Sequence, residues 1–305
     1  MYKQSNIIKT GMKILIINIV LIFVVFQVTG QQLTYQSQYM LNHFEINAAA
    51  SGSTEDLPVS FSFRKLWAGI EGSPSLQSLS AHMALNDNMG TGIKIFNYTA
   101  GPERKTGLEG AYSYHLSLEN INSKLSFGIS FRVYQYFLDK ANMTVEDETD
   151  ELFMGTEKMI VPDGSFGIYL YGKTYYVGLA IPQLIQRTIS LKSDILEQRQ
   201  VRHYFLHGGY NYQINSNFKI EPSVLMKLIE AGIFQADINT MLTYQNMISF
   251  GLSYRTSDAV VFMIGYQYDR FRIGYAFDLT LSDIRTQSNG SHEVFISYSF
   301  DNFLK

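Results

Sequence analysis

The chain has 305 residues, enough for two soluble domains or one large all-β unit, and its 42 Tyr and Phe residues (21 of each) with only 17% charged residues favour strands over disorder. The formal net charge of −3 provides no basic surface for nucleic acid, and the absence of Cys excludes disulfides, thiolate metal sites, a Cys nucleophile and a lipidated Cys. A mean hydropathy of −0.04 is too low for a helical membrane bundle but agrees with a barrel of alternating residues.

The first 30 residues are typical of a secretory signal peptide. Lys9 and Lys13 precede an apolar run from Ile14 to Phe26, and the small residue Gly30 precedes a polar segment. The run is shorter than the roughly 20 residues that span a bilayer, and Asn18 interrupts it, which disfavours the alternative of an uncleaved anchor helix. We therefore expect residues 1–30 to be removed and the mature, exported chain to begin near Gln31.

Beyond the first 56 residues, apolar and polar residues alternate in segment after segment. In the last segment Val294, Ile296, Tyr298 and Phe300 stand two apart, so they share one face of a strand. About fourteen such segments occur, each near the ~10 residues that a tilted membrane strand requires. They lie at or near residues 57–64, 75–85, 92–99, 108–118, 124–133, 164–171, 174–182, 202–213, 218–228, 234–244, 248–254, 260–266, 271–279 and 291–300.

Connection lengths distinguish a membrane barrel from a soluble sandwich. Connections after even-numbered segments are short, whereas the long ones (66–74, 139–163, 182–200 and 282–290) all follow odd-numbered segments. Short turns at one rim and long loops at the other are the pattern of outer-membrane barrels. We therefore predict an all-β fold, a transmembrane antiparallel up-and-down β-barrel of about 14 strands with short periplasmic turns and long extracellular loops. Residues 57–305 would form the barrel, with its apolar rows against lipid, and residues 31–56 an N-terminal periplasmic or lumenal segment.

No sequence motif indicates an active site or a metal site. His203 and His207 lie four apart, which on a strand separates them by about 13 Å, too far to share a metal. The acidic run 145–151 lacks the alternating ligands and central Gly of a calcium loop, and residues 90–95 lack the third Gly of a dinucleotide motif. A catalytic pair made of His115 and a Ser of a neighbouring strand stays open, because the two residues of such a site need not be close in sequence. We expect no enzyme activity and no cofactor.

Three stretches, 39–53, 63–82 and 274–300, resemble the PorP/SprF family of type IX secretion system outer-membrane proteins of Bacteroidota. Two departures are visible: Ala48–Ala50 stand where a Pro-Ala pair is usual, and five residues follow Phe300, where family members often end. Residues 202–212 fit as well. The matching positions are Tyr39, Asn42, Asn47, Gly52, Arg64, Trp67, Gly69, Glu71, Gly72, Pro74, Gln77, Asp278, Leu281, Ser282, Gly290, Ser291, His292 and Glu293.

This resemblance implies a function that the periodicity alone does not. It implies a non-enzymatic outer-membrane barrel that supports secretion and surface anchoring of cargo, such as large gliding adhesins or other proteins with a type B C-terminal signal domain. It also implies further type IX secretion components on the periplasmic side. A passive porin-like channel for small solutes is the alternative, because inward Ser, Asn, Gln and Lys suit either a blocked or an open lumen.

Two groups of residues are the candidate sites. Arg64, late in the first strand, and Glu293, early in the last, both point inward and should form an ion pair where the barrel closes. The loop Trp67–Pro74 carries the only Trp, a residue type common in binding hot spots, and is the expected cargo surface, although Trp67 could instead fold into the lumen. The partner-binding residues expected there are Trp67, Gly69, Glu71, Gly72 and Pro74, with His292 framing the same surface.

Overall fold

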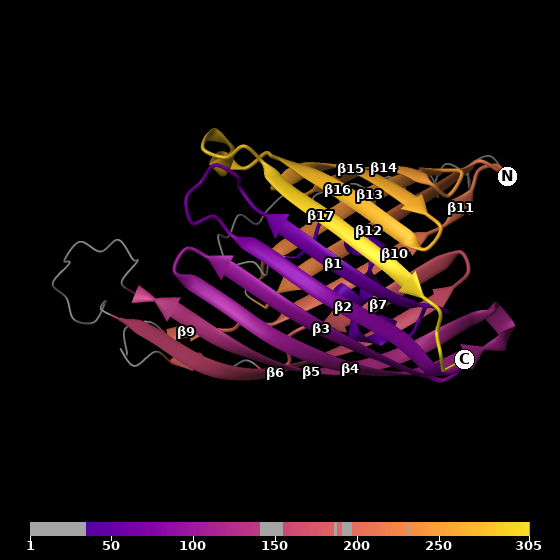
Figure 1. Cartoon of the computed structure of the whole chain (residues 1–305), viewed down its shortest axis with the longest axis horizontal. Helices are drawn as coiled ribbons and strands as arrows, with labels where there is room; N and C mark the ends of the chain where they lie inside the picture. Colours follow the sequence, from indigo (N-terminus) through magenta and orange to yellow (C-terminus); the bar gives the residue numbers. More distant parts are fainter. Residues whose placement is uncertain (1–34, 141–154, 186–187, 191–196, 231, 305) are drawn as a thin grey trace, which may run out of the picture.

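The computed structural model describes residues 35–140, 155–185, 188–190, 197–230 and 232–304. Fourteen strands, each hydrogen-bonded to two neighbours, form a closed antiparallel barrel (Figure 1). They are β1 Leu57–Lys65, β2 Ser75–Asn86, β3 Met89–Ala100, β4 Glu103–Leu118, β5 Ser123–Asp139, β6 Thr156–Gly172, β7 Tyr175–Ile181, β10 His203–Tyr210, β12 Phe218–Ile229, β13 Phe234–Tyr244, β14 Ile248–Arg255, β15 Ala259–Tyr268, β16 Phe271–Thr280 and β17 Ser291–Phe300. In the described part of the chain no helix has the length and apolar character needed to cross a bilayer.

The barrel closes where its first and last strands pair. β1 and β17 run antiparallel, with Leu57 opposite Phe300 at one end and Lys65 opposite His292 at the other. We call this pairing the seam. On the far side of the barrel β10 pairs with β12, and the two-residue strand β11 (Tyr212–Gln213), which follows β10, pairs with the start of β12.

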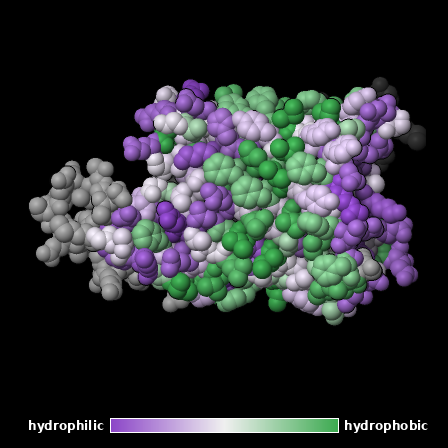
Figure 2. All heavy atoms as spheres, viewed as in Figure 1, coloured by the Kyte–Doolittle hydropathy of each residue, from purple (hydrophilic) through white to green (hydrophobic). Residues whose placement is uncertain are grey.

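The outward rows of the strands are apolar, as alternation predicts. Ile129, Phe131 and Ile160 are each about 60% exposed, which is far more apolar exposure than a soluble surface tolerates over a large patch. Figure 2 shows hydrophobic residues gathered in a broad band across the middle of one face of the barrel, with hydrophilic residues towards both ends. An apolar band of this kind is typical of the membrane-facing surface of an outer-membrane barrel.

The two rims differ as expected. Connections at one rim are short, such as 87–88, 173–174 and 269–270, and we call it the inner rim because short turns face the periplasm. The outer rim carries the long connections, including 66–74 and 281–290. One of these, 182–202, holds a small hairpin of β8 (Thr188–Ser190) and β9 (Glu197–Arg199).

One expected loop is shorter than predicted. Residues 139–163 do not form a single connection, because β6 begins at Thr156. Alternation is hidden there because inward-facing Met159 and Val161 and outward-facing Ile160 are all apolar. The remaining connection, 140–155, includes the acidic run 145–151, which lies outside the described residues.

The core of the molecule is the lumen of the barrel. Residues 35–52, which we call the lumenal segment, lie inside it as turns and three short 3₁₀ helices: η1 (Tyr39–Leu41), η2 (His43–Glu45) and η3 (Ala48–Ala50). Apolar side chains of this segment pack on inward-facing residues of the barrel, in a cluster made of Tyr39, Met40, Ile46, Ala180, Phe205, Leu225, Met241, Val261, Met263 and Ala276.

Candidate functional site

Two outer-rim loops meet above the seam and form one surface. The loop 66–74 follows β1, and the loop 281–290 precedes β17. The backbone N–H of Ala68 donates to the carbonyl of Gly290 at 2.7 Å, and that of Asn289 donates to the carbonyl of Ala68 at 2.7 Å. The N–H of Trp67 donates to Ser291 Oγ at 3.0 Å. We call this joined surface the seam rim.

The backbone of the seam rim is strained at its aromatic residue. Trp67 has a φ of 46°, in the left-handed region that bulky residues rarely adopt. Its side chain is partly exposed, and Glu71 and Gly72 beside it are exposed. Gly69 has a φ of 93°, and a side chain there would collide with the amide of Asn289. Strain of this kind persists where the surrounding structure enforces it, and it is common at binding sites.

Two other residues expected at this surface have structural contacts. The carbonyl of Pro74 accepts a 2.9 Å hydrogen bond from the N–H of Leu66, which closes the base of the loop. His292 lies in the outward row of β17, where its Nδ1 is 2.7 Å from Tyr275 Oη and its ring packs 5.3 Å from that of Phe277. His292 therefore borders the seam rim from the outer face of the barrel.

The structure places Arg64 and Glu293 opposite each other across the seam. Arg64 Nη1 is 3.6 Å from Glu293 Oε2, but the shorter contact of the guanidinium is to Asp278, at 2.7 Å from Nη2. Glu293 is 1% exposed and accepts hydrogen bonds from the backbone N–H of Ser37 at 2.5 Å and of Gln38 at 3.0 Å. The carboxylate therefore joins the seam to the lumenal segment.

This contact belongs to a larger buried charge network that sequence reasoning missed. Asp278 also binds Arg255 at 2.9 Å, and Arg255 in turn lies 3.2 Å from Asp237. Lys227 Nζ completes the chain of contacts, 3.1 Å from Asp237. The sequence does hold a signal for this network. A charged residue in the inward row of a barrel strand is buried, and a buried charge needs a partner. We call the set Arg64, Asp237, Arg255, Asp278 and Glu293, with Ser37 and Gln38, the latch.

A second network holds the middle of the lumenal segment. Glu45 Oε1 accepts a 2.7 Å hydrogen bond from Ser78 Oγ, and Glu45 Oε2 lies 3.8 Å from Lys94 Nζ. Lys94 is also 3.3 Å from Glu109, whose carboxylate accepts a 2.8 Å hydrogen bond from Arg132 Nε. Glu45, Lys94, Glu109 and Arg132 therefore each lie beside a group of opposite sign.

The barrel wall is shaped to receive the backbone of the lumenal segment. Asn47 is 1% exposed; its Oδ1 caps η3 by accepting from the N–H of Ala49 at 3.0 Å, and its Nδ2 donates to the carbonyl of Ile168 at 3.1 Å. This close approach is possible because the facing wall residue, Gly167, has no Cβ. A side chain would collide with the lumenal segment at six inward-facing positions: Gly90, Gly92, Gly128, Gly167, Gly178 and Gly274.

The histidines singled out in the sequence, His115, His203 and His207, are all buried in the lumen. His115 Nε2 lies 2.9 Å from Ser113 Oγ on the same strand, but both residues are buried beneath Ser51, whose carbonyl accepts from Ser113 Oγ at 2.7 Å. No substrate could reach this pair. His203 and His207 both point inward, and in the described part of the chain no three His, Asp or Glu side chains could together hold a metal ion.

The burial of His43 predicts that the stability of the barrel depends on pH. Its Nδ1 is 2.9 Å from Tyr169 Oη, while its Nε2 is buried without a partner. Burial lowers the pKa of His43 from 6.5 to about 4, because a charged ring would bury an unpaired N–H donor. The unfolded chain therefore binds more protons than the folded one between those values. We expect the contribution of His43 to stability to be complete above pH 6.5 and to fall, by at most about 3 kcal/mol, as the pH is lowered towards 4.

The measurement is the denaturation midpoint of the purified barrel between pH 7 and pH 4. Replacing His43 by Asn should flatten the acid side of the profile, whereas replacing His292 by Gln, at the outer rim, should leave it unchanged. An identical acid slope in the His43→Asn variant would contradict the assignment.

A closed fourteen-strand barrel with an apolar outer band and a charged lumen defines an outer-membrane protein. Solved structures agree on the fold: the chain superposes with a TM-score of 0.50 on a FadL homologue from Pseudomonas aeruginosa (10% identity, covering 85% of this chain and 93% of that one). It superposes equally well, also with a TM-score of 0.50, on the toluene transporter TbuX from Ralstonia pickettii (10% identity, covering 90% and 95%). No curated protein sequence matches the chain. The family model of the type IX secretion system membrane protein PorP/SprF matches residues 28–298, and the chain belongs to this family.

Proposed function

We propose that this barrel retains a secreted protein at the cell surface and that the cargo docks on the seam rim. The cargo class would be proteins with a type B C-terminal signal domain, such as large adhesins. The observation that carries the proposal is the filled lumen: residues 36–51 occupy it and are buried against its wall, so a binding surface has to be sought at a rim. Loops on a rigid scaffold are where binding residues concentrate.

Within the outer rim, the seam rim is the best-supported surface. It combines a partly exposed Trp on strained backbone with an exposed carboxylate, Glu71, on a loop held by cross-loop hydrogen bonds. A rigid, partly exposed aromatic residue loses little conformational entropy on binding, which is why Trp is frequent in hot spots. The filled lumen also speaks against the alternative of a passive channel, and the buried Ser113–His115 pair against an enzyme.

The first prediction of this proposal concerns Trp67 and Glu71. In cells expressing a reporter fused to a type B C-terminal signal domain, replacing both residues by Ala should release the reporter into the medium. The level of folded barrel should stay normal, as judged by faster gel migration without heating. Glu119→Ala, an exposed carboxylate at the inner rim, is the matched control and should keep the reporter on the cells. Full retention by the Trp67/Glu71 variant, with normal barrel, would rule the seam rim out.

A further inference from the structure

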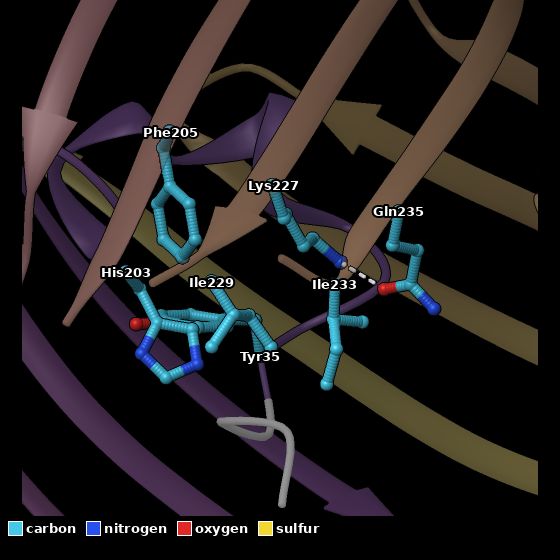
Figure 3. A pocket seen from close by; sticks show the side chains of 7 residues that line it. All are labelled: Tyr35, His203, Phe205, Lys227, Ile229, Ile233 and Gln235. Carbon is cyan, nitrogen blue, oxygen red and sulfur yellow. Dashed lines mark hydrogen bonds between the residues drawn. The ribbon is translucent and has the colours of Figure 1, made fainter. Parts of the chain in front are cut away.

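The pocket beside Tyr35 in the lumen has room for about one water molecule (Figure 3). Its lysine is also engaged, because Lys227 Nζ lies 3.2 Å from Gln235 Oε1 and 3.1 Å from Asp237 Oδ2. The cations of the latch and of the second network likewise have carboxylates beside them. These lumenal cations are therefore satisfied by the protein itself.

Two cations on the outward face of the barrel have no carboxylate partner. Arg104 is the second residue of β4 and Lys158 the third residue of β6, so both lie at the outer ends of their strands, and both side chains are exposed. Within the described residues, neither side chain forms an ion pair or a hydrogen bond. Each is therefore free to bind an external anion.

The two cations flank one aromatic ring. Phe137 of β5 lies opposite Arg104 on one neighbouring strand and opposite Lys158 on the other. Arg104 Cζ is 6.0 Å and Lys158 Nζ 5.5 Å from the centroid of the Phe137 ring. Contacts of this kind attract a cation to the face of the ring, so the two flexible side chains are held beside each other. We call Arg104, Phe137 and Lys158 the outer basic site.

The outer basic site lies where the apolar band ends. Lys158 is two residues beyond the exposed Ile160 in the same outward row, about 7 Å along the strand. In the outward rows of β4, β5 and β6, all three of which the structure describes in full, Arg104 and Lys158 are the only cations. Both are at the outer ends, at the level where the head groups of the outer leaflet follow the hydrocarbon core.

The chemistry of the site fits a phosphate group. The guanidinium of Arg matches two phosphate oxygens at once, and the ammonium of Lys adds a compact charge. Asp139, the one carboxylate in these three outward rows, lies two residues beyond Phe137 at the end of β5, so the rows together keep a positive charge. Because the site is on the side of the barrel and continuous with the apolar band, the molecules that meet it are those of the membrane.

We propose that the outer basic site binds the phosphate of a lipid in the outer leaflet, with the acyl chains of that lipid against Ile160 and Phe131. The phosphate lies between Arg104 and Lys158, and the Phe137 ring separates the stems of the two cations. Such a lipid is a specific ligand of β4–β6 and not a random neighbour of the barrel.

The test is a binding titration of the purified barrel in detergent, followed by native mass spectrometry. The probes are lipid A with its phosphates, the same lipid A after phosphatase treatment, and inorganic phosphate. The wild-type barrel should bind intact lipid A more tightly than either of the other two. Equal binding of the two forms of lipid A would overturn the proposal. Inorganic phosphate that binds as tightly as lipid A would also overturn it, because the site would then recognise a free anion.

Charge-removing variants locate the binding. Replacing Arg104 and Lys158 by Gln should weaken the binding of lipid A by about fivefold for each cation removed, and by about 25-fold for both. Lys158→Arg keeps the charge and should bind like the wild type. The matched control replaces Lys173 and Arg270 by Gln, because these are also one Lys and one Arg, exposed at the inner rim; it should leave the affinity unchanged.

The folding of each variant is checked by its faster gel migration without heating. An unchanged affinity in the folded Arg104/Lys158 variant, or an equal loss in the control, would refute the site. Release of the type B reporter by a variant that still binds lipid A normally would mean that the two cations serve the cargo, and the lipid assignment would be wrong. The comparison of the two forms of lipid A on the wild-type barrel decides the question even where the double variant does not fold.

Discussion

Replacing Glu293 by Ala is expected to lower the free energy of unfolding of the barrel by about 3–5 kcal/mol, the usual cost of removing one partner from a buried, hydrogen-bonded ion pair. The carboxylate accepts from the backbone N–H groups of Ser37 and Gln38 and lies 3.6 Å from Arg64. Truncation leaves both amides without an acceptor and removes one of the two carboxylates next to the guanidinium. The measurement is the denaturant midpoint of purified barrel in detergent at neutral pH.

The chain offers a matched control for this substitution. Arg270 and Asp301 form an ion pair of 2.6 Å whose side chains are 40% and 77% exposed. Because water solvates both groups, Asp301→Ala should change stability little or not at all. If Glu293→Ala were as harmless as Asp301→Ala, the latch would not hold the lumenal segment, and the packing of η1–η3 on the wall would have to do so alone.

The second large effect concerns conduction. The wild-type barrel, reconstituted in a planar lipid bilayer, is expected to show no steady large conductance, because the lumenal segment fills the cross-section with Phe44, Asn47 and Ala49 packed directly on the wall. Deleting residues 36–52 should convert it into a steadily conducting pore, since a fourteen-strand wall alone encloses a wide lumen.

The deletion also removes the two amides that donate to Glu293 and the Glu45 carboxylate beside Lys94, so the variant has to be shown to be folded by its faster gel migration without heating. The wild-type recording is informative even where the variant does not fold. Steady, large conductance through the intact protein would contradict a filled lumen and favour the channel function.

Local periodicity was sufficient to predict the barrel. Each strand has an outward apolar row such as Phe271, Ile273 and Tyr275, and the two-residue spacing of this row is visible in the sequence. The opposition of Arg64 and Glu293 was also predictable, since antiparallel closure brings the end of the first strand to the start of the last. Where residues of both rows are apolar, as at 159–161, the period disappears, and the first part of β6, residues 156–163, was missed.

The contents of the lumen could not be predicted in the same way. The lumenal segment has neither a helical nor a strand period, and its partners are scattered: Ser51 bonds to Ser113, Asn47 to Ile168 and Ser37 to Glu293. Inward glycines such as Gly128 read in the sequence as ordinary small strand residues. Only the three-dimensional structure shows that their missing side chains make room for Ala49.

The latch has a consequence for how the barrel folds. Ser37 and Glu293 are 256 residues apart in the chain, yet their bond lies where the first and last strands meet. The segment directly precedes β1, so it has to lie inside the curved sheet before β17 arrives and seals it there. Contacts of such sequence separation carry a high loop-closure entropy and form late. The seam and the bonds that fix the lumenal segment to Glu293 are therefore expected to form together, and a chain stalled before β17 is added leaves the amides of Ser37 and Gln38 without that acceptor.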